Sequence, residues 1–282
     1  MTIQRSRLHP KVGRGTGRKN SPGRVARRAL TSAWKAWFFI ALLVVWWFVS
    51  LNSTSTFFPP LREIVKTFYD LWIVGDASTT VVSSLVHFAI GYTISGVGGI
   101  VIGVLLWRLP RVSTAVSPLL YFIYVLPAVA ILPAVAALMG YGTEMKVTII
   151  VLAAIWPTLL NTLDGMRSID PVRLDTAKVL HMSGFRTVRS VVFPNALPQI
   201  MAGLRNSLQV AVIMMVVSEL IASTSGIGFF ILDAQQRFAI TEMWTGVIVL
   251  GLIGSALTLV FLAIEHVVLR WYIEQRIVEK NS

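Results

Sequence analysis

The sequence predicts an all-α, polytopic membrane protein, and three observations support this fold class. Of the 282 residues, 55% are hydrophobic and only 13% are charged, whereas a soluble domain has about 25% charged residues. Long apolar segments recur along the chain, and most basic residues lie in alternate connections between them. Cysteine is absent, which excludes a disulfide framework, thiolate chemistry and cysteine metal sites.

Six apolar segments approach or exceed the length of about 20 residues that a helix needs to cross a bilayer. The expected spans cover residues 36–51, 81–107, 112–143, 147–163, 198–222 and 243–264. Between the first two spans, a double proline precedes apolar residues at helical spacing in the segment 57–76. This pattern predicts a short amphipathic helix at the outer membrane interface or capping the bundle.

The distribution of positive charge sets the expected orientation. Of 25 Lys and Arg residues, 21 lie in the two termini, the 108–111 connection, or the 164–197 segment and the start of the span after it. The positive-inside rule therefore places both termini in the cytoplasm, and six crossings agree. Topology explains the net charge of +12, so nucleic-acid binding is not expected. We expect residues 1–32 to form a disordered basic cytoplasmic tail and 33–282 the transmembrane domain.

The second span has a small residue at every fourth position, which forms one ridge along a helix face. These residues are Gly91, Ser95, Gly99 and Gly103. Such a ridge lets a neighbouring backbone approach closely, so we expect a structural role for it.

The third span carries three prolines and cannot be a straight helix, because each proline removes a backbone hydrogen bond. The three are Pro118, Pro127 and Pro133. Broken membrane helices persist where protein or a cavity satisfies the freed groups. The span is therefore a candidate wall of a solute pathway, with simple kinking as the alternative. The candidate pathway or gate residues are Pro127, Pro133, Asn206, Ser207 and Glu219, with Tyr121, Tyr124, Gln209 and Ser218 as further polar groups.

Glu219 is a carboxylate inside an expected span, and such a group indicates function by default. The structural alternative is that Glu219 lies at the outer end of its helix and holds the "STSGIG" turn. The sequence has no HExxH, no P-loop, no Ser/His/Asp set and no residue cluster at metal-ligand spacing. We therefore expect neither enzymatic activity nor a metal or cofactor site in this chain.

The polar segment 164–197 separates two apolar spans and is longer than a connection requires. An Asp-Pro pair at 170–171 predicts a helix start. A short amphipathic helix over 174–180, a turn near 183–184 and a second helix ended by Pro194 are expected to follow. Two short helices with an apolar side outside the bilayer are typical of a docking element for a cytoplasmic partner.

This segment resembles the "EAA" loop of ATP-binding-cassette importer permeases. The family pattern is Glu-Ala-Ala, a Gly six residues after the Glu, and a block that ends in Pro nineteen residues after it. The matching or replacing residues here are Asp175, Thr176, Ala177, His181, Gly184, Phe193 and Pro194. Asp175, Thr176 and His181 depart from the pattern, and Gly184 is expected to supply the flexibility that His181 lacks.

Four further blocks resemble, in the same order, those of nitrate/sulfonate/taurine-type importer permeases. They read "LPAVAILPAVAALMGYGTEMK", "NTLDGMRSIDP", "NALPQIMAGLRNSL" and "VSELIASTSGIGFFI". The resemblance implies a type I importer permease fold in the bacterial inner (plasma) membrane. It also implies a permease homodimer, or a pairing with a similar permease.

The same resemblance implies partners and a solute. Two ATPase subunits, which themselves bind ATP, would dock on the 164–197 loop, and an extracytoplasmic binding protein would deliver the solute. The implied solute is a sulfonate, taurine, nitrate or a similar small anion, and the chain would be a non-catalytic subunit. Acidic substitutions at Ala177 or Phe193 would then uncouple ATPase from transport. A secondary transporter and a membrane scaffold without an ATPase partner are the alternatives.

Overall fold

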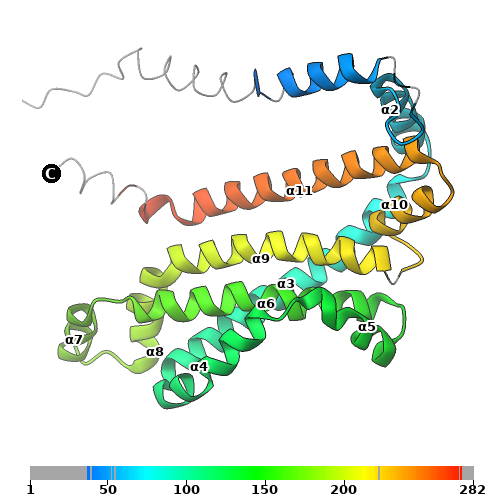
Figure 1. The fold of residues 1–282 in the computed structure, drawn as a ribbon. Helices are drawn as coiled ribbons and strands as arrows, with labels where there is room; N and C mark the ends of the chain where they lie inside the picture. Colours follow the sequence, from blue (N-terminus) through cyan, green and yellow to red (C-terminus); the bar gives the residue numbers. More distant parts are fainter. Residues whose placement is uncertain are drawn as a thin grey trace, which may run out of the picture. The chain divides into compact units, whose positions relative to one another are not determined.

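The computed structural model describes residues 37–38, 40–51, 53, 55–221, 223–272 and 274, whose regular secondary structure is helical (Figure 1). The chain divides into two compact units, Met1–Ser53 and Thr54–Ser282. The described part of the first unit contains the apolar helix Ile40–Ser50, within the first expected span. The expected tail 1–32 lies outside the described residues.

The second unit contains the remaining helices, including two π-helical turns, η1 and η2, each continuous with a helix. In chain order they are α2 (Leu61–Phe68), η1 (Tyr69–Val74), α3 (Ser78–Arg108), α4 (Pro110–Val125), α5 (Ala128–Met139), α6 (Thr143–Arg167), α7 (Pro171–Val179), α8 (Gly184–Thr187), η2 (Val188–Val192), α9 (Phe193–Ile221), α10 (Ile227–Gln236) and α11 (Ile240–Val268).

Four helices in the described part of the chain are long and apolar enough to cross a membrane. They are α3, α6, α11 and the continuous helix Gly184–Ile221 that includes α9. The bent pair α4 and α5 makes a fifth span if it is counted as one. These five elements coincide with the second to sixth expected spans.

The third expected span is broken, as predicted, but only one of its three prolines marks the break. The axes of α4 and α5 meet at 89°. Leu126, directly before Pro127, has an extended backbone with φ −64° and ψ 126°. A proline ring disfavours the helical conformation at the residue before it, and at Leu126 the helix ends. Pro118 and Pro133 lie inside α4 and α5 without ending them.

The predicted ridge of small residues on α3 packs against α6. All four ridge residues are buried. A Cβ atom at Gly99 would lie 2.9 Å from the Ile155 carbonyl oxygen and 3.0 Å from the Leu159 backbone nitrogen. Because these neighbours are backbone atoms, no side-chain rotation can relieve the overlap, and the ridge has the structural role expected of it.

We therefore expect Gly99→Ala to destabilise the protein by about 1–3 kcal/mol, the usual cost of overpacking a close contact. Thermal unfolding of the detergent-solubilised protein measures this effect. Gly251→Ala is the matched control, because Gly251 also lies within a long apolar helix and a Cβ there has nothing within 4 Å. Equal melting temperatures for both variants and the wild type would show that the ridge is not a close contact.

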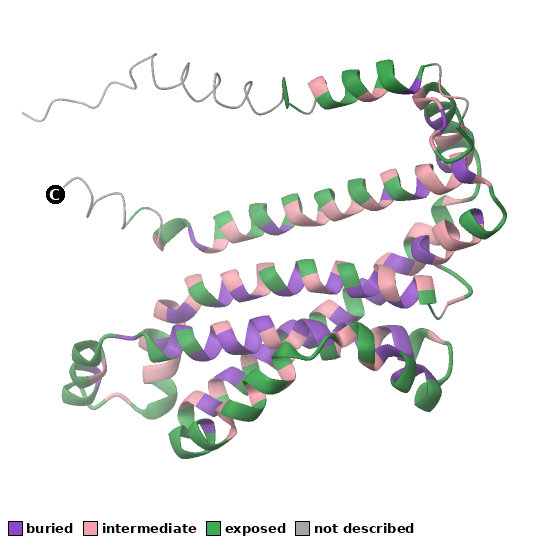
Figure 2. Ribbon diagram, in the orientation of Figure 1, coloured by how far each residue is buried: buried purple, intermediate pink, exposed green. Residues whose placement is uncertain are grey.

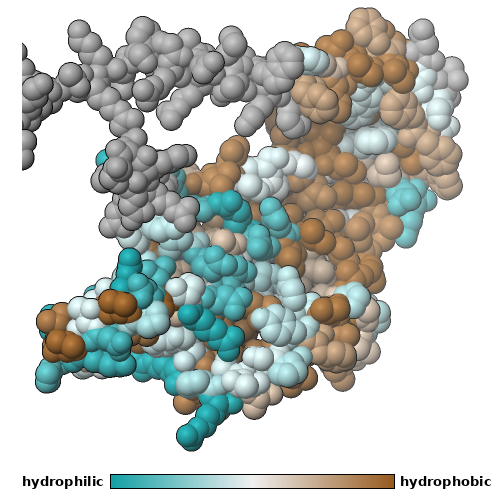
Figure 3. All heavy atoms as spheres, turned by 60° about the vertical axis from the view of Figure 1, so that its left-hand side comes forward, coloured by the Kyte–Doolittle hydropathy of each residue, from teal (hydrophilic) through white to brown (hydrophobic). Residues whose placement is uncertain are grey.

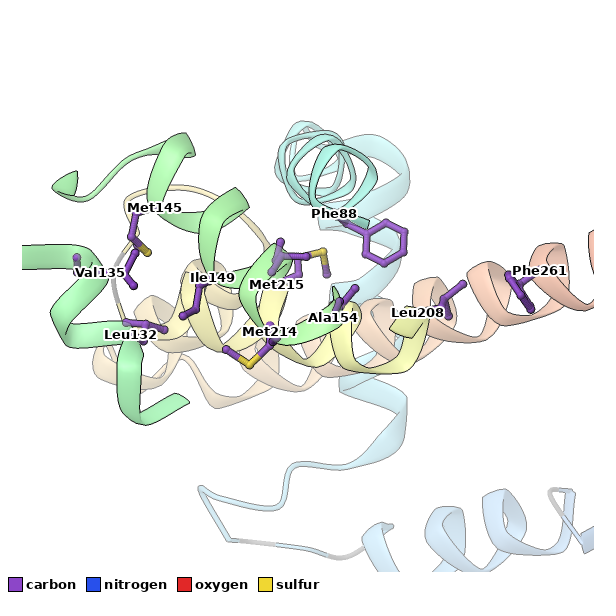
Figure 4. Close-up of a cluster of buried hydrophobic side chains, with 14 of the residues drawn as sticks. Phe88, Leu132, Val135, Met145, Ile149, Ala154, Leu208, Met214, Met215 and Phe261 are labelled. Carbon is purple, nitrogen blue, oxygen red and sulfur yellow. The ribbon is translucent and has the colours of Figure 1, made fainter. Parts of the chain in front are cut away.

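The core of the second unit surrounds α6. In the most apolar stretch of α6, 56% of the residues are buried, whereas in that of α11 the share is 11%. Figure 2 shows this contrast in burial along the two helices. Figure 4 shows the main core cluster, to which α3, α5, α6, α9 and α11 contribute apolar side chains. α6 is therefore the central helix, and α11 leaves most of its apolar surface free of contacts within the second unit.

The amphipathic segment expected at 57–76 forms α2 and η1 after Pro60, which precedes the first helical residue. Its buried side chains are Ile64 and Trp72. The Trp72 indole N–H donates to Thr245 Oγ1 of α11 at 3.0 Å. The segment thus packs against the start of α11, as a cap on this end of the bundle does.

Candidate functional site

The segment between α6 and α9 forms its own small structure at one end of the second unit, where α7 and α8 lie together (Figure 1). α7 begins at the predicted Asp-Pro pair. The Asp170 carboxylate accepts a hydrogen bond of 2.9 Å from the Val172 backbone N–H, which caps the helix start. Ser183 caps α8 in the same way. Hydrophilic atoms gather toward this end of the bundle (Figure 3).

The expectation that Gly184 replaces the missing turn glycine is wrong. His181 itself has a left-handed backbone, with φ +51°. Gly184 begins α8, and in the described part of the chain the glycines with positive φ are Gly140 and Gly226. His181 thus occupies the position of the family's glycine in a glycine-like conformation, which a non-glycine residue adopts at some steric cost.

Pro194 does not end the second helix, contrary to the prediction. The helix continues from Gly184 to Ile221 as one element. The π-helical turn η2 lies directly before α9, at Val188–Val192. A proline inside a helix gives no hydrogen bond to the carbonyl four residues before it, and its ring clashes with that carbonyl. For Pro194 this carbonyl belongs to Ser190, which lies within the wider π turn. Sequence reasoning missed this because a π turn has no clear sequence signal.

The coupling-loop residues expected from the family pattern divide into buried and exposed groups. Ala177 is only 3% exposed, and Phe193 is half-buried against a cluster that contains Met166 and Ile200. Asp175 is exposed and pairs with Lys178 at 2.9 Å. Thr176 is exposed and donates to the Val172 carbonyl. Ala177 and Phe193 therefore support the loop from inside, and an acidic residue at either would disturb packing.

Four exposed apolar residues of the segment between α6 and α9 have side chains free to meet a partner, and we call them the loop patch. They are Val172, Val179, Leu180 and Phe185, each between 67% and 77% exposed. They lie on α7, on α8 and at the turn between these helices, in the polar segment that joins α6 to α9. The loop patch has the character of a docking surface.

A cluster of polar side chains surrounds Glu219, where α3 begins and α9 ends. Glu219 is 1% exposed. Its Oε2 accepts hydrogen bonds from Ser84 Oγ at 2.8 Å and from the Gly228 backbone N–H at 3.0 Å. His87 Nδ1 lies 3.9 Å from Glu219 Oε1. A Cβ atom at Gly226 would overlap the Glu219 carboxylate, so the "STSGIG" turn closes directly over it.

Sequence reasoning missed two members of this cluster, Ser84 and Lys146. Besides bonding Glu219, Ser84 Oγ accepts from the Ile227 backbone N–H at 2.9 Å. Lys146 is 4% exposed, and its ammonium donates to the Ser225 carbonyl at 3.2 Å. Lys146 stands just before an expected span in the sequence, and only the packing of α6 against the turn buries it.

At the neighbouring α10–α11 corner, Arg237 donates a hydrogen bond of 2.9 Å from Nε to Asp233 Oδ2. A terminal guanidinium nitrogen of Arg237 lies 2.8 Å from the same oxygen. The contact with Asp233 raises the pKa of the guanidinium. Glu242 lies 3.4 Å from the same group. The next residue, Phe238, has a φ of +58° and is 72% exposed. This corner is polar and tightly turned.

The remaining predicted pathway residues do not converge on one site. Pro127 lies at the α4–α5 break and Pro133 inside α5. Asn206 is exposed, whereas the buried Ser207 hydroxyl lies 2.7 Å from Thr158 Oγ1 in the α6–α9 contact. Arg205 pairs with Glu265 of α11, with Nε 3.1 Å from Oε2. Its charge is therefore already neutralised within the chain.

A cavity of about 310 Å³ lies where the α4–α5 break faces α6 and α9. Tyr124, named above as a polar pathway candidate, and Trp156 are among its walls. Figure 4 shows two other wall residues, Ile149 and Met214. Within the described residues, no group of three or more His, Cys, Asp or Glu side chains is placed to hold a metal ion.

Residues 95–273 match the family described as "binding-protein-dependent transport system inner membrane component". The chain belongs to this family. The matched range includes the loop patch, the cavity and Glu219. The chain is therefore a permease component of an ATP-binding-cassette importer and a multi-pass membrane protein, as the sequence blocks predicted.

Curated relatives agree with this assignment. The permease is 29% identical over 218 residues to SsuC of Bacillus subtilis (strain 168), by name an aliphatic sulfonates transport permease. This match covers 77% of the chain and 79% of the relative. It is also 29% identical over 240 residues to the taurine transport system permease protein TauC of Escherichia coli (strain K12), covering 82% and 86%.

Among solved structures, the permease resembles a chain of the MetNI methionine ABC transporter in an inward-facing conformation. The TM-score is 0.56 at 17% identity, and the match covers 66% of this chain and 93% of the other. At this identity the likeness concerns the fold alone. It confirms the helical importer-permease fold expected from the sequence.

Proposed function

We propose that the permease couples ATP hydrolysis by partner subunits to solute import through the segment between α6 and α9. The observation that carries this proposal is the loop patch. Its four apolar side chains are exposed beyond the ends of α6 and α9. A capped α7, a tight turn at His181 and the buried Ala177 hold them in place. An apolar surface on a rigid support is what a docked subunit needs in order to transmit its motion.

We further propose the topology. Residues 33–282 would cross the bacterial inner membrane six times, with both termini and the loop patch in the cytoplasm and residues 1–32 as a cytoplasmic tail. The sequence supports this orientation, because 21 of the 25 Lys and Arg residues lie in the termini and in the segments expected on the cytoplasmic side. Glu219 and the "STSGIG" turn would then face the extracytoplasmic side.

The complex would contain two permease subunits, either two copies of this chain or one copy with a similar permease. Two ATP-binding subunits would complete it, with an extracytoplasmic solute-binding protein. Exposed apolar residues on the α4–α5 pair support a large contact within the membrane, among them Val125 at 77% and Leu138 at 87%. The chain would be a non-catalytic subunit and would bind no ATP itself.

The solute proposed from the relatives is a small anion such as a sulfonate, taurine or nitrate. SsuC and TauC carry sulfonate and taurine in their names. In such a system the binding protein selects the solute before the permease meets it.

The test is ATPase activity in proteoliposomes. The permease would be reconstituted with the ATPase subunit encoded beside it, and the neighbouring binding protein would be added with and without candidate solutes. We expect at least a severalfold stimulation by one loaded form. A membrane scaffold would form a complex without any stimulation, and a secondary transporter would take up solute without ATP.

A further inference from the structure

The cavity at the α4–α5 break has walls that limit the kind of solute it can hold. Its volume of about 310 Å³ is at the lower end of small-molecule sites, which usually measure about 300–1,000 Å³. None of the described residues that line it is charged. An inorganic anion placed there would lose its hydration shell without gaining a counter-charge, which is strongly unfavourable.

The cavity lies at mid-depth of the bundle and beside a broken helix. Its walls on α6 fall between Ile149 and Pro157, near the middle of Thr143–Arg167. Irregular backbone at membrane depth persists only where it is buried in protein or lines a cavity. The 89° break between α4 and α5 is such a place.

A few polar groups accompany the apolar walls. Pro157 has no N–H, so the Ala153 carbonyl lacks its normal helical donor. Both residues line the cavity. Trp156 and the half-exposed Tyr124 add two aromatic side chains to the walls, each with one polar group. Apolar walls with aromatic rings and few polar groups are typical of sites for small organic molecules.

We propose that this cavity receives the apolar body of the transported solute, an aromatic group of a small organic compound. The inference rests on the proposed import function and narrows its solute class. A charged head group, where the solute has one, would remain outside these apolar walls. Nitrate and other inorganic anions have no apolar body and would gain nothing from these walls.

The test measures binding to the complete transporter in lipid nanodiscs by equilibrium dialysis. The probes are radiolabelled benzenesulfonate and p-cresol, which share an aromatic body, and nitrate, which has none. We expect saturable binding of at least one aromatic probe and none of nitrate. Ile213→Trp should weaken aromatic binding at least tenfold, because Ile213 is a cavity wall residue, 58% exposed, and a larger side chain there would take up space in the cavity.

Leu252→Trp is the matched control, because Leu252 is also 58% exposed but lies on α11, away from the cavity. It should bind the aromatic probes as the wild type does. Equal binding by the two tryptophan variants, or nitrate binding as strong as aromatic binding, would overturn the proposal. Absence of saturable aromatic binding would also overturn it. That result would mean that a lipid chain or the second permease subunit fills the cavity instead.

The same nanodiscs separate this inference from the import function. If a loaded binding protein stimulates wild-type ATPase activity while no aromatic probe binds, only the cavity proposal fails. If no loaded binding protein stimulates the ATPase, the proposed import function itself fails.

Discussion

Phe185→Asp is expected to abolish solute-stimulated ATPase activity and to reduce transport at least tenfold, with no loss of membrane insertion. Phe185 is 70% exposed and belongs to the loop patch. A carboxylate there would have to lose its hydration whenever the ATPase subunit docks. This free-energy cost arises only in the complex and not in the permease alone. The measurements are transport in proteoliposomes and co-purification of the ATPase subunit.

Phe185→Leu is the matched control, since it keeps an apolar side chain at the same position and should retain most of the activity. Ala177→Asp provides a contrast. Because Ala177 is 3% exposed, this variant should also lower the melting temperature of the permease alone. Unchanged transport by Phe185→Asp would show that the loop patch is not the docking surface.

Glu219→Ala is expected to destabilise the permease by about 2–6 kcal/mol. The change would leave the Ser84 hydroxyl and the Gly228 N–H without their acceptor in a buried site. Each orphaned donor costs about 1–3 kcal/mol. The "STSGIG" turn would also lose the carboxylate over which it closes. Thermal unfolding and proteolysis within the turn are the measurements.

Two further variants test whether the stability depends on the shape of the Glu219 side chain, on its charge or on its buried position. Glu219→Gln keeps an oxygen that can accept both hydrogen bonds, so most of the stability should remain. Glu144→Ala removes an exposed carboxylate from the first turn of α6 and should change little. A melting temperature for Glu219→Ala equal to that of Glu144→Ala would contradict a structural role for Glu219. Normal folding of Glu219→Gln with lost transport would instead assign it to the gate.

Local sequence patterns were sufficient for much of the fold. The apolar runs predicted the elements that became α3, α6, α9 and α11, because a helix is the way a single segment satisfies its own backbone in lipid. The small-residue ridge of α3 predicted a close helix contact, and α6 supplies it. The Asp-Pro pair at 170–171 marked a helix start because capping depends on neighbouring residues alone.

Predictions failed where the outcome depends on contacts between distant segments or on subtle backbone adjustments. The third expected span contains three prolines, and the sequence does not indicate at which of them the helix ends. The passage of the helix through Pro194 depends on the π-helical turn before it. The left-handed backbone of His181, in place of a flexible Gly184, likewise follows from the fold of the loop.

The sequence by itself determined the class of the molecule, its helical segments and the location of the polar segment between α6 and α9, because hydropathy, charge asymmetry and capping are local properties. Only the tertiary structure decided which loop residues are free to dock, and it brought Ser84, Lys146 and Glu219 together from three helices. It also decided the cavity, whose walls come from α4, α5, α6 and α9. Burial and enclosure arise from segments far apart in the chain, and no local pattern encodes them.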